Sequence, residues 1–438
     1  MEFSGIYIME MSFVRNGMTS LKAMQDNAVD KGRLQINVTS EITAFPITDA
    51  TISISYTGVP DSTLEQVGTD ASGQSEVLEL STPPLEYSLN PTIESQPYAE
   101  YTLNISAPGY ETVSVAGAEV LPEVKAIQNI RLRPLAEVSQ DETVFVIPAH
   151  TLYGDYPPKI AEDEIKPIDE TGEIVLSRVV VPEFIIVHDG SPRDPTANNY
   201  YVRYRDYIKN VASSEIYATW PADTIRANVL AIMSFTLNRV YTEWYRNKGY
   251  DFTITSSTAF DHKWIPERNI FDTISVIVDE LFASYLSRPN VRQPILTQYC
   301  DGRRVSCPNW MTQWGSMELG QQGYSPIEIL RYFYGDDMYI NSAEEISGVP
   351  SSWPGYNLGI GASGDKVRQM QEQINVIAGA YPAIPRIDAD GIFGPATANA
   401  VEIFQSVFGL PQTGIVDYST WYKISEIYVG VSRIAELV

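Results

Sequence analysis

Between residues 33 and 134, apolar side chains alternate with polar ones or form short runs that Gly, Pro and Asp interrupt. The segments with this pattern are RLQINVTS, ATISISYT, EVLELS, YAEYTLNIS and AIQNIRLRP. Alternation with a period of two residues is typical of β-strands that bury one face. Short strands separated by turns predict a small β-sandwich for this part of the chain.

A helical period replaces this alternation in the centre of the chain. From Ala222 to Arg246, apolar residues lie on both faces of the expected helix, which indicates deep burial. Pro221 suits the first turn of this helix, and Gly249 follows its end. Apolar residues also recur at helical spacing from Ile270 to Leu286, which predicts a second helix. The mixture of strands and helices over residues 183–346 predicts an α+β domain.

Two stretches of different composition separate the expected domains. Residues 135–182 are acidic, contain several prolines and lack helical periodicity, so we expect an extended connector that proteases can reach. Residues 347–362 are rich in Gly, Pro and Ser, which is typical of a linker. The chain is therefore expected to be multidomain. Its expected parts are an N-terminal segment 1–32, the β-sandwich 33–134, the connector 135–182, the α+β domain 183–346, the linker 347–362 and a helical unit 363–438.

The charged residues narrow the choice of partners. The chain holds 30 Lys and Arg against 55 Asp and Glu, which gives a formal net charge of -25. An acidic surface repels nucleic-acid phosphates and anionic lipids, so we expect neither as a partner. Glu2 and Glu10 interrupt the N-terminal apolar residues, so no signal peptide and no membrane span are expected there. An insoluble carbohydrate polymer remains compatible with this charge.

The last unit carries a motif that spans most of its length. The motif consists of GASGDKVRQMQ from residue 361, DGIFGPAT from 390, AVEIFQ from 400, TG at 413 and TW at 420. It resembles the three-helix peptidoglycan-binding domain, and this resemblance implies peptidoglycan as a partner. The motif residues that we assign to this module are Asp390, Gly391, Phe393, Gly394, Thr397, Gln405 and Trp421. An alternative is that each of them builds the fold, as buried aromatic residues and turn glycines usually do.

One carboxylate in the centre of the chain stands out. Glu215 ends the short amphipathic stretch YIKNVASSE, just before Trp220 and Pro221. Aromatic and aliphatic neighbours raise the pKa of a carboxyl group, as a general acid requires. A solvated carboxylate at the end of a helix is the alternative interpretation of the same pattern.

The surrounding sequence resembles the stage II sporulation protein D (SpoIID) family over about residues 183–341. The matching segments are VASSEIYATWP with TIRANVLAIMSFTL, SSTAFD at 256–261, and QWGS, QQGY, IL and YFYG from residue 313 onward. The resemblance implies a lytic transglycosylase whose catalytic residue is Glu215, and a polar strand at 256–261. Asn228 and Met233 stand where the family often has Gln and Arg, and WMT replaces its usual His-Gly.

The order of the parts resembles the clostridial spore cortex-lytic enzymes of the SleC type. In this resemblance the β-domain is similar to the transthyretin-like, carboxypeptidase-regulatory type. It implies an inactive precursor, made without a signal peptide in the mother cell and deposited at the boundary of the spore cortex and coat. It also implies an activating protease that acts on germination, and the connector 135–182 is where its cut would fall.

Metal chemistry has little support in the sequence. The histidines are His150, His188 and His262, and no two of them have the spacing of zinc ligands. We therefore expect no metal and no other cofactor. His262 follows Asp261 in the polar segment, where it could line a cleft or lie at the surface.

The two cysteines have three interpretations. Cys300 and Cys307 flank DGRRVS, which suggests a hairpin, and a disulfide across such a hairpin is geometrically reasonable. Free thiols are the second interpretation. A metal site is the third, since two cysteines need further ligands and the histidines lie far away in the sequence.

Together these features predict a peptidoglycan lytic transglycosylase. Glu215 would protonate the glycosidic oxygen and then accept the proton of the muramic acid 6-hydroxyl. The residues expected to position the sugar are Ser257, Thr258, Tyr299 and Gln313. A hydrolytic muramidase is an alternative that needs a second carboxylate, such as Asp261 or Asp301. The non-enzymatic alternative is a spore-coat or wall protein that binds glycan without cleaving it.

Overall fold

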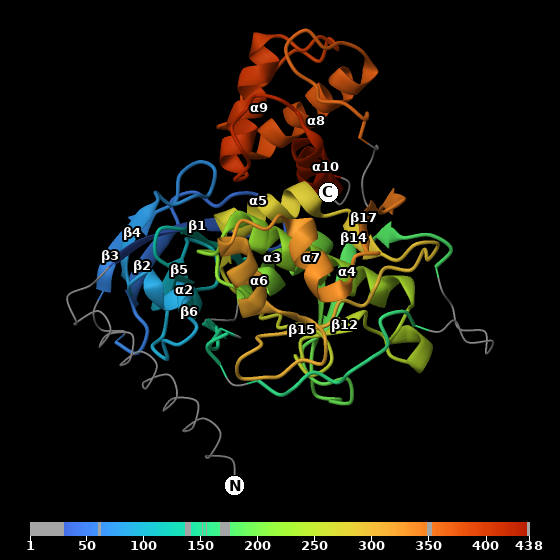
Figure 1. Cartoon of the computed structure of the whole chain (residues 1–438). Coiled ribbons are helices and arrows are strands. Elements are labelled where there is room, and N and C mark those ends of the chain that lie inside the picture. Colours follow the sequence, from blue (N-terminus) through green and yellow to red (C-terminus); the bar gives the residue numbers. More distant parts are fainter. Residues whose placement is uncertain are drawn as a thin grey trace. The chain divides into compact units, whose positions relative to one another are not determined.

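The computed structural model describes residues 30–59, 63–135, 142–150, 152–154, 156–166, 176–347 and 353–435. Most of the expected N-terminal segment and parts of the connector and the linker lie outside these residues. The chain divides into two compact units. Unit 1 comprises residues 1–148, 267–272 and 349–438, and unit 2 comprises residues 149–266 and 273–348. The chain therefore contains several folded parts, with strands at the blue end of the colour scale in Figure 1 and helices at its orange and red end.

Two sheets form the N-terminal part of unit 1. The first has the order β13-β7-β1-β4, with bounds Ile270–Phe271, Lys125–Leu132, Asp30–Ser40 and Leu78–Thr82. The second has the order β3-β2-β5-β6-β8, with bounds Thr63–Gly68, Thr51–Tyr56, Ala99–Ser106, Val113–Val120 and Thr143–Val146. A short helix, α2 (Glu86–Leu89), follows β4. Along β1, Leu34, Ile36 and Val38 are fully buried while the residues between them are partly exposed. This alternation is what the sequence predicted for a sheet with one buried face.

A segment from the middle of the chain completes the first sheet. The strand β13 pairs antiparallel with β7, where Ile270 lies opposite Ile127. Beside it, the buried guanidinium of Arg268 binds the buried carboxylate of Glu119 at 2.7 Å. The prediction of one helix over Ile270–Leu286 is therefore wrong at both ends. Helix α5 covers Asp272–Leu281 only, and Ser284–Ser287 forms strand β14. Apolar spacing alone could not separate these elements, because β14 owes its strand conformation to pairing with β17 (Tyr339–Ser342).

Unit 2 consists of helices and several small sheets. Its other strands are β9 (Val180–Val181), β10 (Phe184–His188), β11 (Asn199–Arg203), β12 (Ile254–Thr255), β15 (Tyr299–Cys300), β16 (Met311–Thr312) and β18 (Glu345–Ile346). Its helices besides α5 are α3 (Tyr204–Glu215), α4 (Ala222–Tyr241), η1 (Arg246–Lys248), α6 (Gln313–Gln321) and α7 (Pro326–Tyr334). Strand β10 pairs antiparallel with β11 and parallel with β12. Strands β14 and β17 pair antiparallel, and β9 pairs parallel with β18.

The long helix α4 begins at Ala222, as the sequence predicted, and Pro221 precedes its first residue. Beyond its first turn and Arg226, nearly all of its residues are buried, which explains the absence of a polar face in its sequence. The helix ends at Tyr241, five residues before the predicted end. Glu243 adopts a positive φ of 45°, a conformation that an α-helix does not allow. Glu243 therefore lies in a turn and not within the helix, where the sequence had suggested it.

The expected connector 135–182 does not form one extended segment in the residues that the structure describes. Strand β8 pairs parallel with β6 and belongs to unit 1. Residues 149–150, 152–154 and 156–166, which we call the arm, belong to unit 2. His150 and Leu152 are buried, and Lys166 is only 6% exposed. The structural boundary of unit 2 therefore lies at residue 149, well before the expected boundary at 183.

The C-terminal part of unit 1 contains three helices, as the motif predicted. They are α8 (Asp365–Ala380), α9 (Pro395–Val407) and α10 (Tyr418–Ala435). Pro395 occupies the first turn of α9, and Phe393, Phe404 and Trp421 are almost fully buried between the helices. None of the helices in the described part of the chain has the length and apolar composition of a membrane span.

Candidate active site

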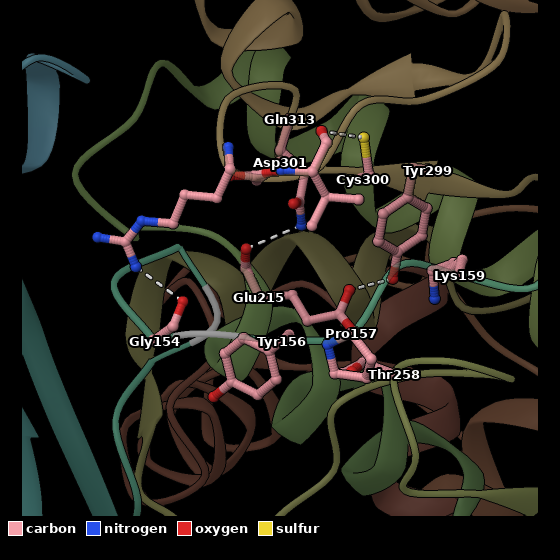
Figure 2. Close-up of a pocket in the computed structure, with 12 residues that line it drawn as sticks. Gly154, Tyr156, Pro157, Lys159, Glu215, Thr258, Tyr299, Cys300, Asp301 and Gln313 are labelled. Atoms are coloured by element: carbon pink, nitrogen blue, oxygen red, sulfur yellow. Dashed lines mark hydrogen bonds between the residues drawn. The ribbon is translucent and has the colours of Figure 1, made fainter.

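A pocket of unit 2 gathers residues from distant parts of the chain (Figure 2). Its lining residues are Gly154, Tyr156, Pro157, Lys159, Glu215, Thr258, Tyr299, Cys300, Asp301, Arg304, Val305 and Gln313. They come from the arm, the end of α3, the loop after β12, β15 with the loop that follows it, and the start of α6. The predicted catalytic residue and three of the four predicted sugar-binding residues therefore share one pocket.

Glu215 is the last residue of α3 and is 1% exposed. The helix ends here because Ile216 adopts an extended conformation. The ring of His150 fixes this end: its Nε2 donates to the carbonyl oxygen of Ile216 at 3.0 Å, and the ring stacks on Tyr217. The carboxyl group of Glu215 consequently points into the pocket from a rigid helix terminus, as Figure 2 shows. The alternative of a solvated carboxylate is wrong.

Two hydrogen-bond donors hold the carboxyl group of Glu215. Its Oε1 accepts the backbone N–H of Lys263 at 2.6 Å, and its Oε2 accepts the hydroxyl of Tyr299. Burial raises the pKa of Glu215 above its ordinary value, and the positive charge of Lys159 and these two hydrogen bonds oppose the rise. The net direction is upward, so the carboxyl group keeps its proton at a higher pH than an exposed glutamate does.

Tyr299 connects the carboxyl group to a second layer of buried rings. Its ring stacks on His262 with 5.9 Å between ring centroids. His262 is fully buried, and its Nδ1 lies 3.1 Å from the hydroxyl of Tyr207. Burial lowers the pKa of His262 well below its ordinary value, which keeps the ring neutral. His262 therefore neither lines the pocket nor lies at the surface, the two positions that its polar neighbours had suggested.

The predicted sugar-binding residues occupy different positions. Thr258, Tyr299 and Gln313 line the pocket, while Ser257 is not among its lining residues. Residues 256–261 form a turn after β12 and not the expected polar strand, because the carbonyl of Ser257 accepts the backbone N–H groups of Phe260 and Asp261. Gln313 donates from Nε2 to the backbone carbonyl of Glu215 at 2.9 Å, which ties α6 to the end of α3.

The other carboxylates named from the sequence already have several hydrogen-bond partners each. Asp261 is fully buried and binds Arg239 Nε at 2.8 Å, the Tyr245 hydroxyl at 2.6 Å and the Thr255 hydroxyl at 2.7 Å. Asp301 accepts the backbone N–H groups of Arg304 and Val305 at 2.8 and 2.9 Å. Asp261 therefore holds a buried guanidinium, and Asp301 holds the loop that follows β15.

One of the two cysteines, Cys300, lines this pocket. Cys300 and Cys307 form a disulfide with 6.0 Å between their Cα atoms. The segment between them is not a hairpin, since β15 and β16 pair parallel and Cys307 lies in the loop that connects them. The described residues contain no group of three His, Cys, Asp or Glu side chains arranged to hold a metal ion.

Two of the three departures from the SpoIID pattern, Asn228 and Met233, lie in α4. Asn228 donates to the carbonyl of Thr224 and to the hydroxyl of Ser316, at 2.9 and 2.8 Å, and so joins α4 to α6. Met233 is fully buried in α4. Neither residue lines the pocket, so both substitutions concern the packing of the helix.

The arm was not among the site elements predicted from the sequence. Gly154, Tyr156, Pro157 and Lys159 line the pocket, although the composition of 135–182 indicated a connector. The one signal in the sequence was Lys159, which follows two prolines and precedes a run of acidic residues in PPKIAEDE. Such a residue can pair with opposite charges elsewhere, but the pattern does not say which.

The motif residues of the C-terminal module build its fold. Gln405 is fully buried: its Oε1 accepts the N–H groups of Thr413 and Gly414, and its Nε2 donates to Ile415 and Thr420. Gln371 of α8 makes a similar set of hydrogen bonds. Its Oε1 accepts the N–H of Gly391, and its Nε2 donates to the carboxylate of Asp390 and to the hydroxyl of Thr397. Gly391 and Gly414 both adopt positive φ, which explains the glycines of the motif.

Comparison with solved structures gives only weak similarities. The TIE protein of Bacillus anthracis matches 24% of this chain and 17% of its own, with 16% identity and a TM-score of 0.16. A catechol 1,2-dioxygenase of Acinetobacter radioresistens matches 27% and 59%, with 14% identity and a TM-score of 0.18. The minor pilin GBS52 of Streptococcus agalactiae matches 28% and 49%, with 10% identity and a TM-score of 0.17. Scores this low carry no argument about fold or function.

Curated proteins give clearer matches over short stretches. The zinc D-Ala-D-Ala carboxypeptidase of Streptomyces albus G is 40% identical over 77 residues, 17% of this chain. An uncharacterised protein of Kitasatospora aureofaciens is 44% identical over 63 residues, 14% of this chain. The chain spans 28% and 49% of the lengths of these two relatives. Residues 363–424 match the family described as "Putative peptidoglycan binding domain", so the C-terminal part of this chain is a peptidoglycan-binding domain.

Proposed function

We propose that this protein is a lytic transglycosylase that cleaves the glycan strands of peptidoglycan, with Glu215 as its acid and base. The observation that carries the proposal is a buried carboxyl group of raised pKa, held by Tyr299 and Lys263 at the wall of a pocket. The peptidoglycan-binding domain at residues 363–424 gives the substrate class. Binding to the polymer raises the effective concentration of glycan at the pocket.

The reaction needs one proton and no water. Glu215 in its acid form donates its proton to the glycosidic oxygen as the bond between this oxygen and the anomeric carbon of the muramic acid breaks. The resulting carboxylate then removes the proton from the 6-hydroxyl of the same sugar, whose oxygen forms the new bond to the anomeric carbon. The product carries a 1,6-anhydro ring, and Glu215 regains its proton. A positioned general acid and base of this kind typically contributes a factor of about 10²–10⁴ to the rate.

The environment of the other carboxylates supports this reaction over hydrolysis. A hydrolytic glycosidase uses a second carboxylate, either to activate water or to attack the sugar. Asp261 is bound to Arg239 and Tyr245, and Asp301 to the backbone of its own loop. Asp301 lines the pocket, but both of its carboxylate oxygens already accept backbone N–H groups, and Asp261 is not among the lining residues. A mechanism that needs Glu215 alone fits this arrangement best.

The resemblances named above set the biological context of the proposal. A SpoIID-like catalytic domain and a transthyretin-like N-terminal domain, followed by the binding domain, suit a SleC-type enzyme that degrades spore cortex on germination. In that context the chain is a precursor at the boundary of cortex and coat, which an activating protease cuts. A cut before residue 149 would leave unit 2 with all residues of its pocket, since every lining residue follows Ala149.

Product analysis tests the proposal. Purified cortex and vegetative-wall sacculi are digested with the full chain before and after limited proteolysis, and the fragments are analysed by mass spectrometry and by a reducing-end assay. We expect fragments with 1,6-anhydromuramic ends and no rise in reducing ends. A rise in reducing ends would instead identify a hydrolytic muramidase. Binding to sacculi without any released glycan would identify a non-catalytic wall protein.

A further inference from the structure

We propose that the arm is part of the catalytic domain and that its Lys159 is a positioning residue, which stabilises the carboxylate form of Glu215 after proton donation. The inference rests on the proposed function and adds to it a residue outside the SpoIID-like segment. Lys159 lies 24 residues before the expected start of that domain at 183 and lines the pocket together with Glu215.

Lys159 reaches Glu215 through the ring of Tyr299. Its ammonium lies 5.0 Å from the centre of the Tyr299 ring and 5.5 Å from that of Phe235. It also donates a hydrogen bond to the backbone carbonyl of Asp261. Figure 2 shows Lys159 beside Tyr299, whose hydroxyl points to Glu215. Tyr299 therefore makes a cation–π contact with Lys159 through its ring and a hydrogen bond to the carboxyl group of Glu215 through its hydroxyl.

Among the carboxylates near Lys159, Glu215 is the one that is not paired with Arg239. Lys159 forms no direct ion pair within the described residues. Glu162 and Asp261 already bind the buried Arg239, at 2.6 and 2.8 Å. Burial lowers the pKa of Lys159, and the charge of Arg239 from α4 acts in the same direction. The charges of Glu215 from α3, Asp261 from the loop after β12 and Glu162 from the arm itself oppose this fall. The charges of Lys159 and Lys263 both favour the carboxylate form of Glu215, and the charge of Lys159 has the larger effect.

The arm is held firmly enough to position a side chain. The backbone N–H of Ile160 donates to the carbonyl of Ala259 at 2.7 Å, and the backbone of Glu164 accepts the N–H of Leu296 at 2.8 Å. The side chain of Gln298 bridges two arm residues: its Oε1 accepts the N–H of Glu162, and its Nε2 donates to the carbonyl of Ile160. Backbone bonds of this kind are those of a packed segment and not of a solvated connector.

Ion pairs reinforce these bonds. The carboxylate of Glu162 accepts hydrogen bonds from both Nη atoms of Arg239, at 2.6 and 3.0 Å, and this guanidinium is fully buried. The carboxylate of Glu164 accepts hydrogen bonds from Nε and Nη2 of Arg288, at 2.6 and 2.8 Å. Two-point contacts of guanidinium with carboxylate fix direction as well as distance. The acidic composition of the arm is therefore the counterpart of arginines that belong to the rest of unit 2.

The test replaces Lys159 in the full chain by Met and by Arg, with Lys248→Met as the control. Lys248 is exposed and lies outside the pocket. Removal of a preorganised electrostatic group costs about 10²-fold or more in rate, and an opposite charge nearby shifts a carboxyl pKa by about one unit or more. We expect K159M to lower kcat/KM by about a hundredfold. The alkaline limb of its pH profile should move upward by about one pH unit, because Glu215 loses a charge that favours ionisation. K159R should restore most of kcat/KM and most of the original position of the alkaline limb. K248M should match the parent chain in both quantities.

An infrared readout keeps this test separate from the proposed function. The carboxyl band of Glu215, obtained as the difference between the parent chain and Glu215→Gln, reports the titration of this group without any substrate. An upward shift of this titration in K159M supports the inference even if no 1,6-anhydro product is found, an outcome that would overturn the proposed function alone. If the parent chain makes that product and K159M leaves both the titration and the pH profile unmoved, Lys159 is only structural and the inference is overturned.

Discussion

The hydroxyl of Tyr299 donates a hydrogen bond to Oε2 of Glu215, and the two side chains come from positions 84 residues apart. Burial raises the pKa of both groups. The tyrosine is therefore a neutral donor over the whole range in which the carboxyl group titrates. The pair combines an acid that keeps its proton with a partner that steadies the anion left after the proton has moved.

Replacement of the carboxyl group should stop catalysis without unfolding the protein. Glu215→Gln keeps the size of the side chain and can still accept the N–H of Lys263, but it cannot transfer a proton. We expect the release of glycan from sacculi to fall by about 10²–10⁴-fold, the usual contribution of general acid–base catalysis. Binding to sacculi and thermal unfolding should not change.

Glu280→Gln is the matched control for this substitution. Glu280 lies in α5, is partly exposed and pairs with Arg226 at the surface. Loss of such a pair costs about 0–1 kcal/mol, so the activity should stay close to that of the parent chain. Full activity of Glu215→Gln on the same sacculi would remove Glu215 from the mechanism.

Removal of the Tyr299 hydroxyl should change the pH dependence of the reaction. The hydrogen bond favours the charged form of Glu215, so its loss in Tyr299→Phe raises the pKa of Glu215 further. The acid form then persists to higher pH, and the alkaline limb of kcat/KM should move upward by about one pH unit. Tyr332→Phe, at a side chain that is 68% exposed, serves as the control and should leave the profile in place. A downward shift in Tyr299→Phe would contradict the role of the hydroxyl.

Asp261 should prove structural. Asp261→Asn removes one of the two carboxylates that bind the buried Arg239, the one at 2.8 Å. Breaking one side of a buried ion pair costs about 3–5 kcal/mol, so we expect a clear loss of unfolding free energy in denaturant. Asp336→Asn, on the exposed turn after α7, should show no such loss. An Asp261→Asn chain of undiminished stability and no activity would point instead to a second catalytic carboxylate and to hydrolysis.

The buried amides of the C-terminal module should govern its stability. Gln405→Leu leaves the N–H groups of Thr413 and Gly414 without their acceptor. Each buried group without a partner costs about 1–3 kcal/mol, so the module should unfold at lower temperature and sediment less with sacculi. The exposed Gln412→Leu is the control in the same loop. Deletion of residues 363–438 should abolish most of the sedimentation but leave cleavage of soluble fragments. Unchanged sedimentation of the deleted chain would mean that glycan binding resides elsewhere.

Much of the secondary structure followed from local signals. The start of α4 was predicted because Pro221 fixes the backbone at that position, whereas the three helices of the module were expected from the resemblance of its motif to the peptidoglycan-binding domain. The spacing of apolar residues around Glu215 indicated an element that ends there, and α3 does end there. In contrast, residues 284–287 continue a helical pattern and form a strand, since their partner β17 lies far along the chain.

The alternation of buried strands and the start of α4 follow from the sequence alone. Periodicity, proline and glycine act within a few residues of themselves, so these elements can be recognised locally. In contrast, long-range contacts bind Asp261 to Arg239, bury His262 and pack the acidic arm on the rest of unit 2. Each of these depends on a partner that the chain brings from far away: Glu162 meets Arg239 across 77 residues and Glu164 meets Arg288 across 124. An acidic stretch is a solvated connector or a packed arm according to the cations that folding places against it, and its composition does not reveal them.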